Sequence, residues 1–352
     1  MISKNNHVLV LKNDAVGDLT KSLHAINNII KNNRDQKIII YLSERSEKFS
    51  FLINNANVKF KKLNYNLSFL EKIRLFLFIL NTNISKVYIL TPKVFYFWLP
   101  LIFKKIKFYG LCINGINNYK RPKEFLRKYL FKYVINNRSA IFKRDSTEMI
   151  QHELTKNINQ LGLESKININ IELSDVLKKY LPKNYFYFHV NKQRLDALGW
   201  GIAEIKLLLD ELLKYSPNVV ITKDIEVDEN SKILKKNFNS FDFKSNNYLN
   251  KNKKVIFLDN IDGKDIYNVI KLSKKIVAFH GMMTGLGSIS KKKILDLYVC
   301  NIKNWNDYRS YRNSFYEFKP SYKGYDFIIP SKNIHKTIKK INFSLEKIKN
   351  EI

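Results

Sequence analysis

Two aspartates and a glycine stand close together after the first apolar run of the sequence. The run His7–Lys12 leads into a short segment that contains Asp14, Gly17 and Asp18. A carboxylate held at a strand-to-helix turn can act as a general base and take the proton of an attacking hydroxyl. An aspartate before a helix also commonly caps its N–H groups, and the spacing alone favours this role for Asp18. The segment lacks the GxGxxG pattern, so it does not indicate a nicotinamide dinucleotide site.

A second candidate is the glycine-rich stretch that begins at His280. Gly281, Gly285 and Gly287, three of only 11 glycines in the chain, fall within seven residues, with Thr284 among them. Glycines at a strand-to-helix turn let backbone N–H groups approach a diphosphate, and the helix dipole adds to the attraction. An ordinary structural turn is the alternative, but this concentration of glycines favours a diphosphate site.

Basic residues follow two further apolar runs in the second half of the chain. Lys192 and Arg194 come after the first run, and Thr222 and Lys223 after the next. These cations could meet the charge of a diphosphate, although a solvated basic loop explains Lys192 and Arg194 equally well. Glu226 could reach a ribose hydroxyl.

The apolar runs alternate with helical patterns, which predicts an α/β protein with parallel sheets. We expect strands at 7–12, 37–43, 87–90, 107–110, 185–190, 218–222, 255–258, 276–279 and 294–299, and helices from 20 and at 124–134, 146–161, 203–215, 229–237 and 264–273. This pattern predicts two doubly wound domains, residues 1–165 and 180–330, joined by a polar linker near 162–182 and followed by a helix within 331–352. Such sheets bind ligands at the carboxyl ends of their strands, so we expect a cleft between the two domains.

The opening Lys12-x-Asp14-x-x-Gly17-Asp18 resembles that of the ADP-heptose:lipopolysaccharide heptosyltransferases, glycosyltransferase family 9, which typically begins with Arg in place of Lys12. Further stretches along nearly the whole chain resemble the family in the same order: Glu148–Leu163, Phe188–Val190 with Trp200, Phe257–Leu258, and Asp265 through Ile276 to Gly281. Together these ordered stretches are more specific than any one of them.

The resemblance implies a GT-B type fold, in which two Rossmann-like domains face a central cleft. It implies an inverting transfer of a sugar, heptose from ADP-heptose, to a lipopolysaccharide core, with Asp18 in the place of the general base. Asp14, Gly17 and Lys93 fall on the acceptor side. No cofactor or metal is implied, in agreement with the lack of an Asp-x-Asp metal clamp.

One stretch departs from the family. Where the family typically reads Asp-Ser/Thr-Gly-x-x-His, this chain has His280 in place of the aspartate and Gly285 where the histidine is expected. The departure leaves open the nucleotide, the sugar and whether His280 takes over the missing role. A GT-B-like protein without catalytic activity is therefore one alternative.

The charge of the chain points to polyanionic partners. Its 352 residues include 62 Lys and Arg against 31 Asp and Glu, a net charge of +31, while 45% hydrophobic residues exclude a disordered polyelectrolyte. Part of the charge reflects the abundance of Lys, Asn and Ile throughout, as in AT-rich genomes. A nucleic-acid-binding protein is a second alternative. No nucleic-acid-binding motif is present in the sequence, however, so we do not expect nucleic acid as a partner.

The segment from Lys104 to Lys132 contains nine Lys and Arg and a single acid, Glu124, among aromatic residues. It suits contact with an acidic glycolipid or a membrane surface, although an amphipathic helix with its apolar side in the core would look the same. The longest apolar run, Val94–Phe103, is about half of a membrane span. No signal peptide is evident, and the two cysteines suit a reducing compartment. We therefore expect a cytoplasmic protein that contacts the inner face of the cytoplasmic membrane.

Overall fold

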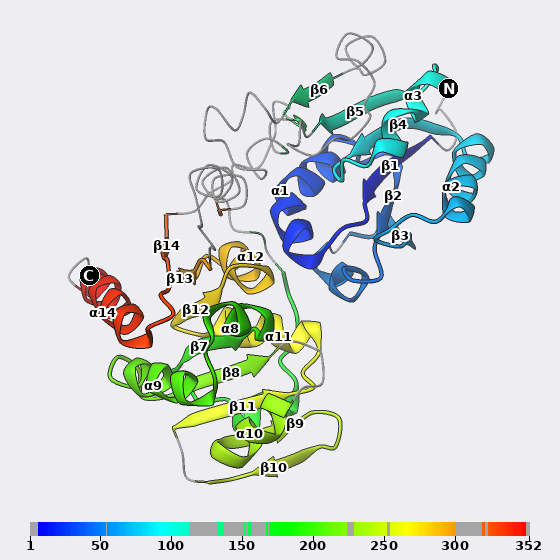
Figure 1. The fold of residues 1–352 in the computed structure, drawn as a ribbon. Helices are drawn as coiled ribbons and strands as arrows, with labels where there is room; N and C mark the ends of the chain where they lie inside the picture. Colours follow the sequence, from blue (N-terminus) through cyan, green and yellow to red (C-terminus); the bar gives the residue numbers. More distant parts are fainter. Residues whose placement is uncertain are drawn as a thin grey trace. The chain divides into compact units, whose positions relative to one another are not determined.

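The structure is a computed structural model that describes residues 6–53, 55–112, 133–136, 151, 154–155, 167, 169–223, 229–251, 254–299, 319–320 and 323–349. The chain divides near Ile169 and Asn170 into two compact units, each built on its own sheet (Figure 1). Glu226, residues 113–132 of the basic segment, and most of the helices expected at 124–134 and 146–161 lie outside the described residues.

The first unit contains a six-stranded parallel sheet in the order β3-β2-β1-β4-β5-β6. Its strands are β1 (His7–Lys12), β2 (Lys37–Leu42), β3 (Val58–Lys62), β4 (Ile84–Ile89), β5 (Lys107–Cys112) and β6 (Tyr133–Asn136). The helical segments are α1 (Val16–Asn32), η1 (Glu47–Leu52), α2 (Phe69–Asn81), η2 (Val94–Phe97) and α3 (Leu99–Ile102). The chain order reverses between β1 and β4, and ligands of open α/β sheets bind at such a switch point, beyond the carboxyl ends of the strands.

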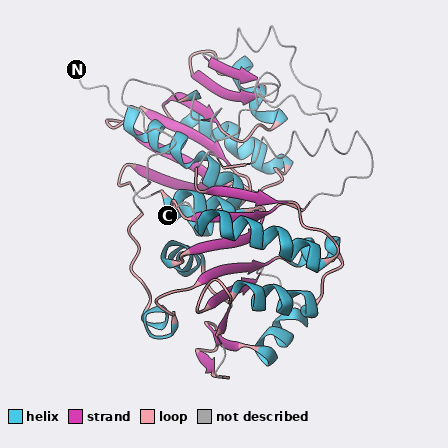
Figure 2. Ribbon diagram, turned by 90° about the vertical axis from the view of Figure 1, so that its left-hand side faces the viewer, coloured by secondary structure: helices cyan, strands magenta, loops and turns pink. Residues whose placement is uncertain are grey.

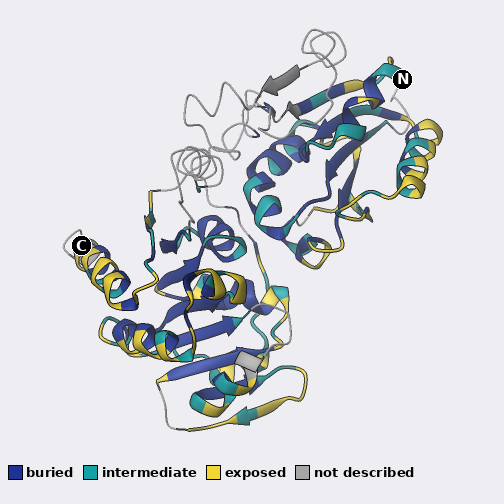
Figure 3. Cartoon of the chain, in the orientation of Figure 1, coloured by how far each residue is buried: buried dark blue, intermediate teal, exposed yellow. Residues whose placement is uncertain are grey.

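Helices α1 and α2 cover opposite faces of this sheet (Figures 1 and 2). Leu9 and Leu11 of β1 pack with Leu75 and Ile79 of α2 in one core cluster. Every residue of β1 after His7 is buried, as expected of a parallel strand with helices on both faces (Figure 3). This double cover explains why the strand reads as a continuous apolar run.

The second unit has an eight-stranded sheet in the order β10-β9-β11-β8-β7-β12-β13-β14, parallel except for β10 against β9. Its strands are β7 (Phe186–Val190), β8 (Val219–Lys223), β9 (Asn239–Asp242), β10 (Asn247–Leu249), β11 (Val255–Asp259), β12 (Lys275–Phe279), β13 (Lys293–Leu297) and β14 (Tyr325–Ile328). Its helices are α7 (Asp175–Tyr180), α8 (Lys192–Leu198), α9 (Ile202–Leu212), α10 (Glu229–Asn237), α11 (Gly263–Leu272), α12 (Met282–Ile289) and α14 (Ile334–Lys349). The switch point lies between β7 and β12.

The beginning and the end of this unit show the structure of the expected linker and terminal helix. Helix α7 lies inside the stretch that we expected to be a plain polar linker, and Ser174 caps it by accepting the N–H of Leu177. Helix α14 places Ile341 and Leu345 in the core cluster of the second unit. None of the described helices is long and apolar enough to cross a membrane.

Gly287 lets α12 lie close against the sheet. A Cβ atom at this position would overlap Ile276 Cδ1 and lie 3.1 Å from Ile294 Cδ1. We expect Gly287→Ala to destabilise the protein by about 1–3 kcal/mol, because the helix must move away from β12 and β13. Urea unfolding measures this loss. Gly201→Ala is the matched control, since its Cβ would meet only Glu204 Oε2 at 3.6 Å, and equal stability of the two variants would contradict the close packing.

Lys275 begins β12 as a buried lysine, and its Nζ has no hydrogen-bond partner among the described residues. Burial lowers its pKa from 10.5 to about 8, against the opposing effect of Asp326. Below about pH 8 the folded protein must bury the charged ammonium, a cost that disappears as the pH rises from the folded to the unfolded pKa. Lys275→Met should therefore raise the free energy of unfolding by about 1–3 kcal/mol near neutral pH, and this gain should shrink towards about pH 10. Urea unfolding at both pH values tests this expectation, and a gain that does not change with pH would contradict it.

Candidate functional site

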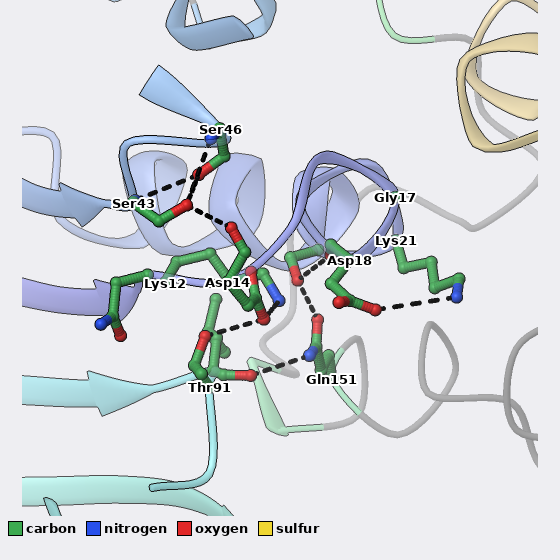
Figure 4. Close-up of polar contacts among 12 residues, drawn as sticks. Lys12, Asp14, Gly17, Asp18, Lys21, Ser43, Ser46, Thr91 and Gln151 are labelled. Atoms are coloured by element: carbon green, nitrogen blue, oxygen red, sulfur yellow. Dashed lines mark hydrogen bonds and ion pairs between the residues drawn. The ribbon is translucent and has the colours of Figure 1, made fainter. Parts of the chain in front are cut away.

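In the first unit, the turn after β1 is held by the buried side chain of Asp14. Its Oδ2 accepts hydrogen bonds from Lys12 Nζ at 2.6 Å and from Thr91 Oγ1 at 2.8 Å (Figure 4). Ser43 Oγ donates to the Asp14 carbonyl at 2.5 Å. One residue thus joins the carboxyl ends of β1, β2 and β4. The expected contact of Asp14 with an acceptor stays a prediction, and within the described residues its Oδ2 is bound inside the turn.

The electrostatic environment of Asp14 is strongly perturbed. Burial raises the pKa of its carboxyl and the nearby Asp18 carboxylate adds to this, while the ammonium of Lys12 acts in the opposite direction. Oδ1 is buried without a hydrogen-bond partner among the described residues. A perturbed, buried carboxyl at a sheet switch point marks a functional-site candidate, here as the support of the turn that carries Asp18.

Asp18 lies on the first turn of α1 and does not cap the helix. The residue in the capping position is Ala15, whose carbonyl accepts the N–H of Asp18 at 3.1 Å and of Leu19 at 3.0 Å. The alternative that Asp18 is an N-cap carboxylate is therefore wrong. Its side chain is 36% exposed, and Lys21 Nζ lies 3.9 Å from Oδ1 (Figure 4). This leaves an accessible carboxylate at the carboxyl edge of the sheet.

Gln151 connects the first turns of α1, which carry Asp18, to the end of β4. Ser22 Oγ lies 3.0 Å from the Asp18 carbonyl oxygen and 2.5 Å from Gln151 Oε1. Gln151 Nε2 donates to the carbonyl of Leu90, just beyond β4, at 3.1 Å. Gln151 lies in one of the stretches that resemble the family, but its residue type and spacing did not distinguish it from its neighbours. Only the fold brings it to α1.

Lys93 is part of a small cationic cluster near the same edge. Its Nζ donates to the carbonyl of Tyr65 and lies 5.0 Å from the centroid of the Tyr65 ring, above which the Arg45 guanidinium lies at 4.4 Å. Burial lowers the pKa of Lys93, while Asp14 and other carboxylates act in the opposite direction. From the sequence we singled out neither Arg45 nor Tyr65, although Arg45 comes just after β2.

In the second unit, Thr222 lies buried where β8 ends. Its Oγ1 is 2.5 Å from Tyr187 Oη and 2.9 Å from His189 Nδ1, both on the neighbouring strand β7. Tyr187 Oη also contacts Met283 Sδ at 3.3 Å, which links β7 to α12. Thr222 therefore joins the end of β8 to β7, and Lys223 is the last residue of β8.

Lys192 and Arg194 begin a helix and do not form a loop. Asn191 caps α8 by accepting the N–H of Arg194 at 2.9 Å. Asparagine is a preferred N-cap residue, so the sequence itself contains a signal for this helix start. Lys192 Nζ lies 3.4 Å from Asp196, and both side chains are at least half exposed. The two cations are thus fixed to the first turn after β7.

The glycine-rich stretch is a helix start and its three glycines differ in role. Gly281 precedes α12 with a φ of +156°, which side-chain-bearing residues rarely adopt. Thr284 Oγ1 accepts the N–H of Gly281 at 3.1 Å and donates to the Gly281 carbonyl at 2.7 Å. Gly285 lies inside α12, where its N–H already donates to the Gly281 carbonyl at 3.2 Å. The N–H groups of both Gly281 and Gly285 are thus engaged within the turn, so Gly285 does not offer its N–H to a diphosphate, and Gly281 could contribute only a close approach of the backbone.

His280 is oriented by a buried carboxylate. Its Nδ1 lies 2.6 Å from Oδ2 of Asp296, which is fully buried and also accepts the Tyr325 hydroxyl at 2.6 Å. This hydrogen bond occupies Nδ1, so Nε2 is the ring nitrogen left for another contact. Asp296 Oδ1 is buried without a partner among the described residues. From the sequence we singled out neither Asp296, which contacts His280 from β13, nor Tyr325, which contacts Asp296 from β14.

We expect Asp296→Asn to weaken binding of free nucleoside diphosphate about tenfold, because the hydrogen bond that orients His280 is lost. The effect should be absent in the His280→Ala background, so that the double variant binds no worse than His280→Ala alone. Calorimetric titration of the four proteins, with circular dichroism to confirm folding, measures this coupling. Additive losses would mean that Asp296 acts independently of His280.

Solved structures resemble the whole chain at low sequence identity. An ADP-heptose lipopolysaccharide heptosyltransferase II from Escherichia coli aligns at 12% identity and a TM-score of 0.63, over 97% of this chain and 99% of the other. A family 9 glycosyl transferase from Veillonella parvula aligns at 10% identity and 0.62, over 97% and 91%. A UDP-GlcNAc 2-epimerase from Methanocaldococcus jannaschii aligns at 15% identity and 0.54, over 96% and 92%. No protein-family model and no curated protein sequence matches the chain.

The chain has the GT-B fold. The expected α/β class with two Rossmann-like units is thereby confirmed. Because sugar transferases and nucleotide-sugar epimerases share this fold, the reaction must be argued from the site. Within the described residues, no group of three or more His, Cys, Asp or Glu side chains is placed to hold a metal ion.

Proposed function

We propose that the chain is an inverting glycosyltransferase that moves a sugar from a nucleotide sugar to a hydroxyl of an acidic glycolipid. The observation that carries this proposal is the carboxylate of Asp18, which is accessible at the switch point of the first sheet and is free of a capping role. ADP-heptose and a lipopolysaccharide core are the first donor and acceptor to test. One solved structure of the same fold is an E. coli heptosyltransferase with ADP, at 13% identity and a TM-score of 0.55.

In the proposed reaction Asp18 takes the proton of the acceptor hydroxyl. The hydroxyl oxygen forms a bond to the anomeric carbon as the bond from that carbon to the diphosphate breaks, and the nucleoside diphosphate leaves with both electrons. Attack from the face opposite the leaving group inverts the anomeric centre. An ordinary carboxylate suffices, because the hydroxyl becomes acidic only as the new bond forms.

The second unit offers groups that suit the departing diphosphate. Gly281 gives a close backbone approach at the start of α12, where the first N–H groups have no partner within the helix. Nε2 of His280 and the cations Lys192, Arg194 and Lys223 add positive charge or hydrogen bonds. These groups support transfer without a metal ion. Glu226 remains a prediction for the ribose.

On the first unit we assign the acceptor to Gly17 and Lys93, with Asp14 holding the turn beneath them. We add Tyr65 and Arg45 to the acceptor side, because Tyr65 contacts Lys93 and Arg45 lies over the Tyr65 ring. Basic side chains here suit the phosphate groups of an acidic glycolipid. We propose that such an acceptor is met on the cytoplasmic face of a membrane.

A GT-B-like protein without catalytic activity is the second candidate, and the replacement at His280 favours it. It differs from the first candidate in keeping nucleotide binding without transfer. The hydrogen bonds that join Asp296 to His280 and Tyr325 hold the His280 ring in place, which favours a working diphosphate site in either candidate.

A thermal-shift panel of ADP-, UDP-, GDP- and CMP-sugars, measured in EDTA, tests the proposal. A ligand at about 100 times its Kd stabilises the folded protein by about 2.7 kcal/mol, which raises Tm by a few degrees. We expect one nucleotide series to do so. If none of the four raises Tm while an RNA oligonucleotide does, the protein binds nucleic acid and the proposal is wrong.

A further inference from the structure

Helix α2 has an apolar side that the core does not use. Its inner side places Leu75 and Ile79 in the core of the first unit. Its outer side carries five large apolar residues with exposed fractions between 39% and 74% (Figure 3). We call these the outer stripe: Phe69, Leu70, Ile73, Leu77 and Leu80.

The outer stripe is a single helical face. Successive residues turn by about 100°, so steps of four, four and three from Phe69 to Leu80 stay on one side of the helix, and Leu70 borders them. The side of a surface helix that faces away from the core is normally polar. An exposed apolar face of this kind marks an interaction surface.

The apolar surface continues beyond α2. The ring of Phe76 lies 5.2 Å from that of Phe103, which directly follows α3. Ile102, the last residue of α3, is 58% exposed. The apolar surface thus spans two segments that are distant in the sequence.

Basic residues border the outer stripe, and their charge indicates an anionic partner. Lys72 and Arg74 lie on its two sides by helical rotation, and Lys104 and Lys105 follow Phe103. The only acid of α2, Glu71, accepts the N–H groups of Asn64 and Ser68 at the start of the helix. Aliphatic and aromatic residues bordered by Lys and Arg are typical of helices that lie on anionic lipid. Nucleic-acid interfaces are more polar, so the exposed leucines favour lipid.

We propose that the outer stripe and its bordering cations dock the protein on the surface of an anionic lipid bilayer. The helix would lie in the plane of the membrane, with the stripe among the acyl chains and the cations at the headgroups. From the sequence we expected the membrane contact at Lys104–Lys132, whereas the outer stripe lies on α2 and is bordered by Lys104 and Lys105 of that segment. Docking is independent of the proposed reaction, because vesicle binding requires no nucleotide sugar.

Sedimentation of the full chain with lipid vesicles tests the docking surface. Wild type should sediment with vesicles of phosphatidylcholine mixed with phosphatidylglycerol, less with phosphatidylcholine alone, and less at high salt. Leu70→Ser with Leu77→Ser should lower the partition coefficient at least about tenfold, because two leucines no longer enter the acyl region. Lys72→Glu with Arg74→Glu should remove the preference for phosphatidylglycerol.

The matched control is Leu207→Ser with Leu272→Ser, two leucines of the second unit with comparable exposure, which should bind vesicles like wild type. Circular dichroism and Tm confirm that all variants are folded. Unchanged vesicle binding by the Leu70 and Leu77 double variant would overturn the proposal. So would a wild-type dimer that this variant converts to monomer without any vesicle binding, or RNA binding that only this variant loses.

Discussion

Asp18→Asn should lower the turnover number about 10²–10⁴-fold, the usual contribution of a general base. The amide has nearly the same shape as the carboxylate but cannot take the proton of the acceptor hydroxyl. Because Ala15 occupies the capping position of α1, the substitution removes no N-cap hydrogen bond and Tm should change little. Nucleotide-sugar binding, which we assign to the second unit, should be largely kept. Steady-state kinetics and donor titration measure the two effects separately.

Asp35→Asn is the matched control for this substitution, since Asp35 is an exposed aspartate shortly after the end of α1. It should leave turnover unchanged. An Asp18→Asn protein that stays active and loses several degrees of Tm would show that Asp18 only stabilises the helix.

Gly281→Val should weaken binding of the nucleotide sugar and of free nucleoside diphosphate alike, by about 10- to 100-fold. At a φ of +156° a β-branched residue is strained by about 1–3 kcal/mol, so the backbone in front of α12 must change shape. No atom lies within 4 Å of the added Cβ position, so the effect comes from conformation and not from a clash. Acceptor binding should be nearly unchanged. Calorimetric titration with the nucleoside diphosphate measures the loss directly.

Gly199→Val separates this effect from general instability, because Gly199 also has a positive φ, +68°, and no atom within 4 Å of its Cβ position. It should lower Tm without a comparable loss of affinity. Lys192→Ala should weaken the same ligands less than Gly281→Val, because Arg194 can partly replace a flexible point charge. A fall in acceptor affinity with nucleoside diphosphate affinity unchanged would reverse our assignment of the two units.

The sequence predicts the inner strands of both sheets well, because they are covered on both faces and read as apolar runs. Strand β1 has the expected bounds, β7, β11 and β12 differ from expectation by one residue at one end, and β8 is shifted by one residue at both ends. The sequence missed the outer strands. In β3 lysines alternate with Val58 and Phe60 as at a sheet edge, and β9 reads Asn-Ser-Phe-Asp, whose strand form depends on pairing with β11.

The candidate site was less predictable, because most of its contacts join residues far apart in the chain. Asp14 and Asp18 were visible as types and spacing, but the hydrogen bonds to Asp14 come from Ser43 and Thr91, which follow the strands β2 and β4. Likewise His280 was visible, whereas its partner Asp296 reads as one polar residue within an apolar strand. Spacing along the chain shows which residues could act, and the register of parallel strands decides which of them meet.

Metal-independent sugar transfer with inversion is most directly tested by following nucleoside diphosphate release and acceptor glycosylation together. The assay contains ADP-heptose and a lipopolysaccharide-core acceptor in excess EDTA. We expect one glycosylated acceptor for each diphosphate released, with inverted configuration at the anomeric carbon and no release without acceptor. Conversion of the nucleotide sugar to an isomer without acceptor, or activity that EDTA abolishes and manganese restores, would contradict it.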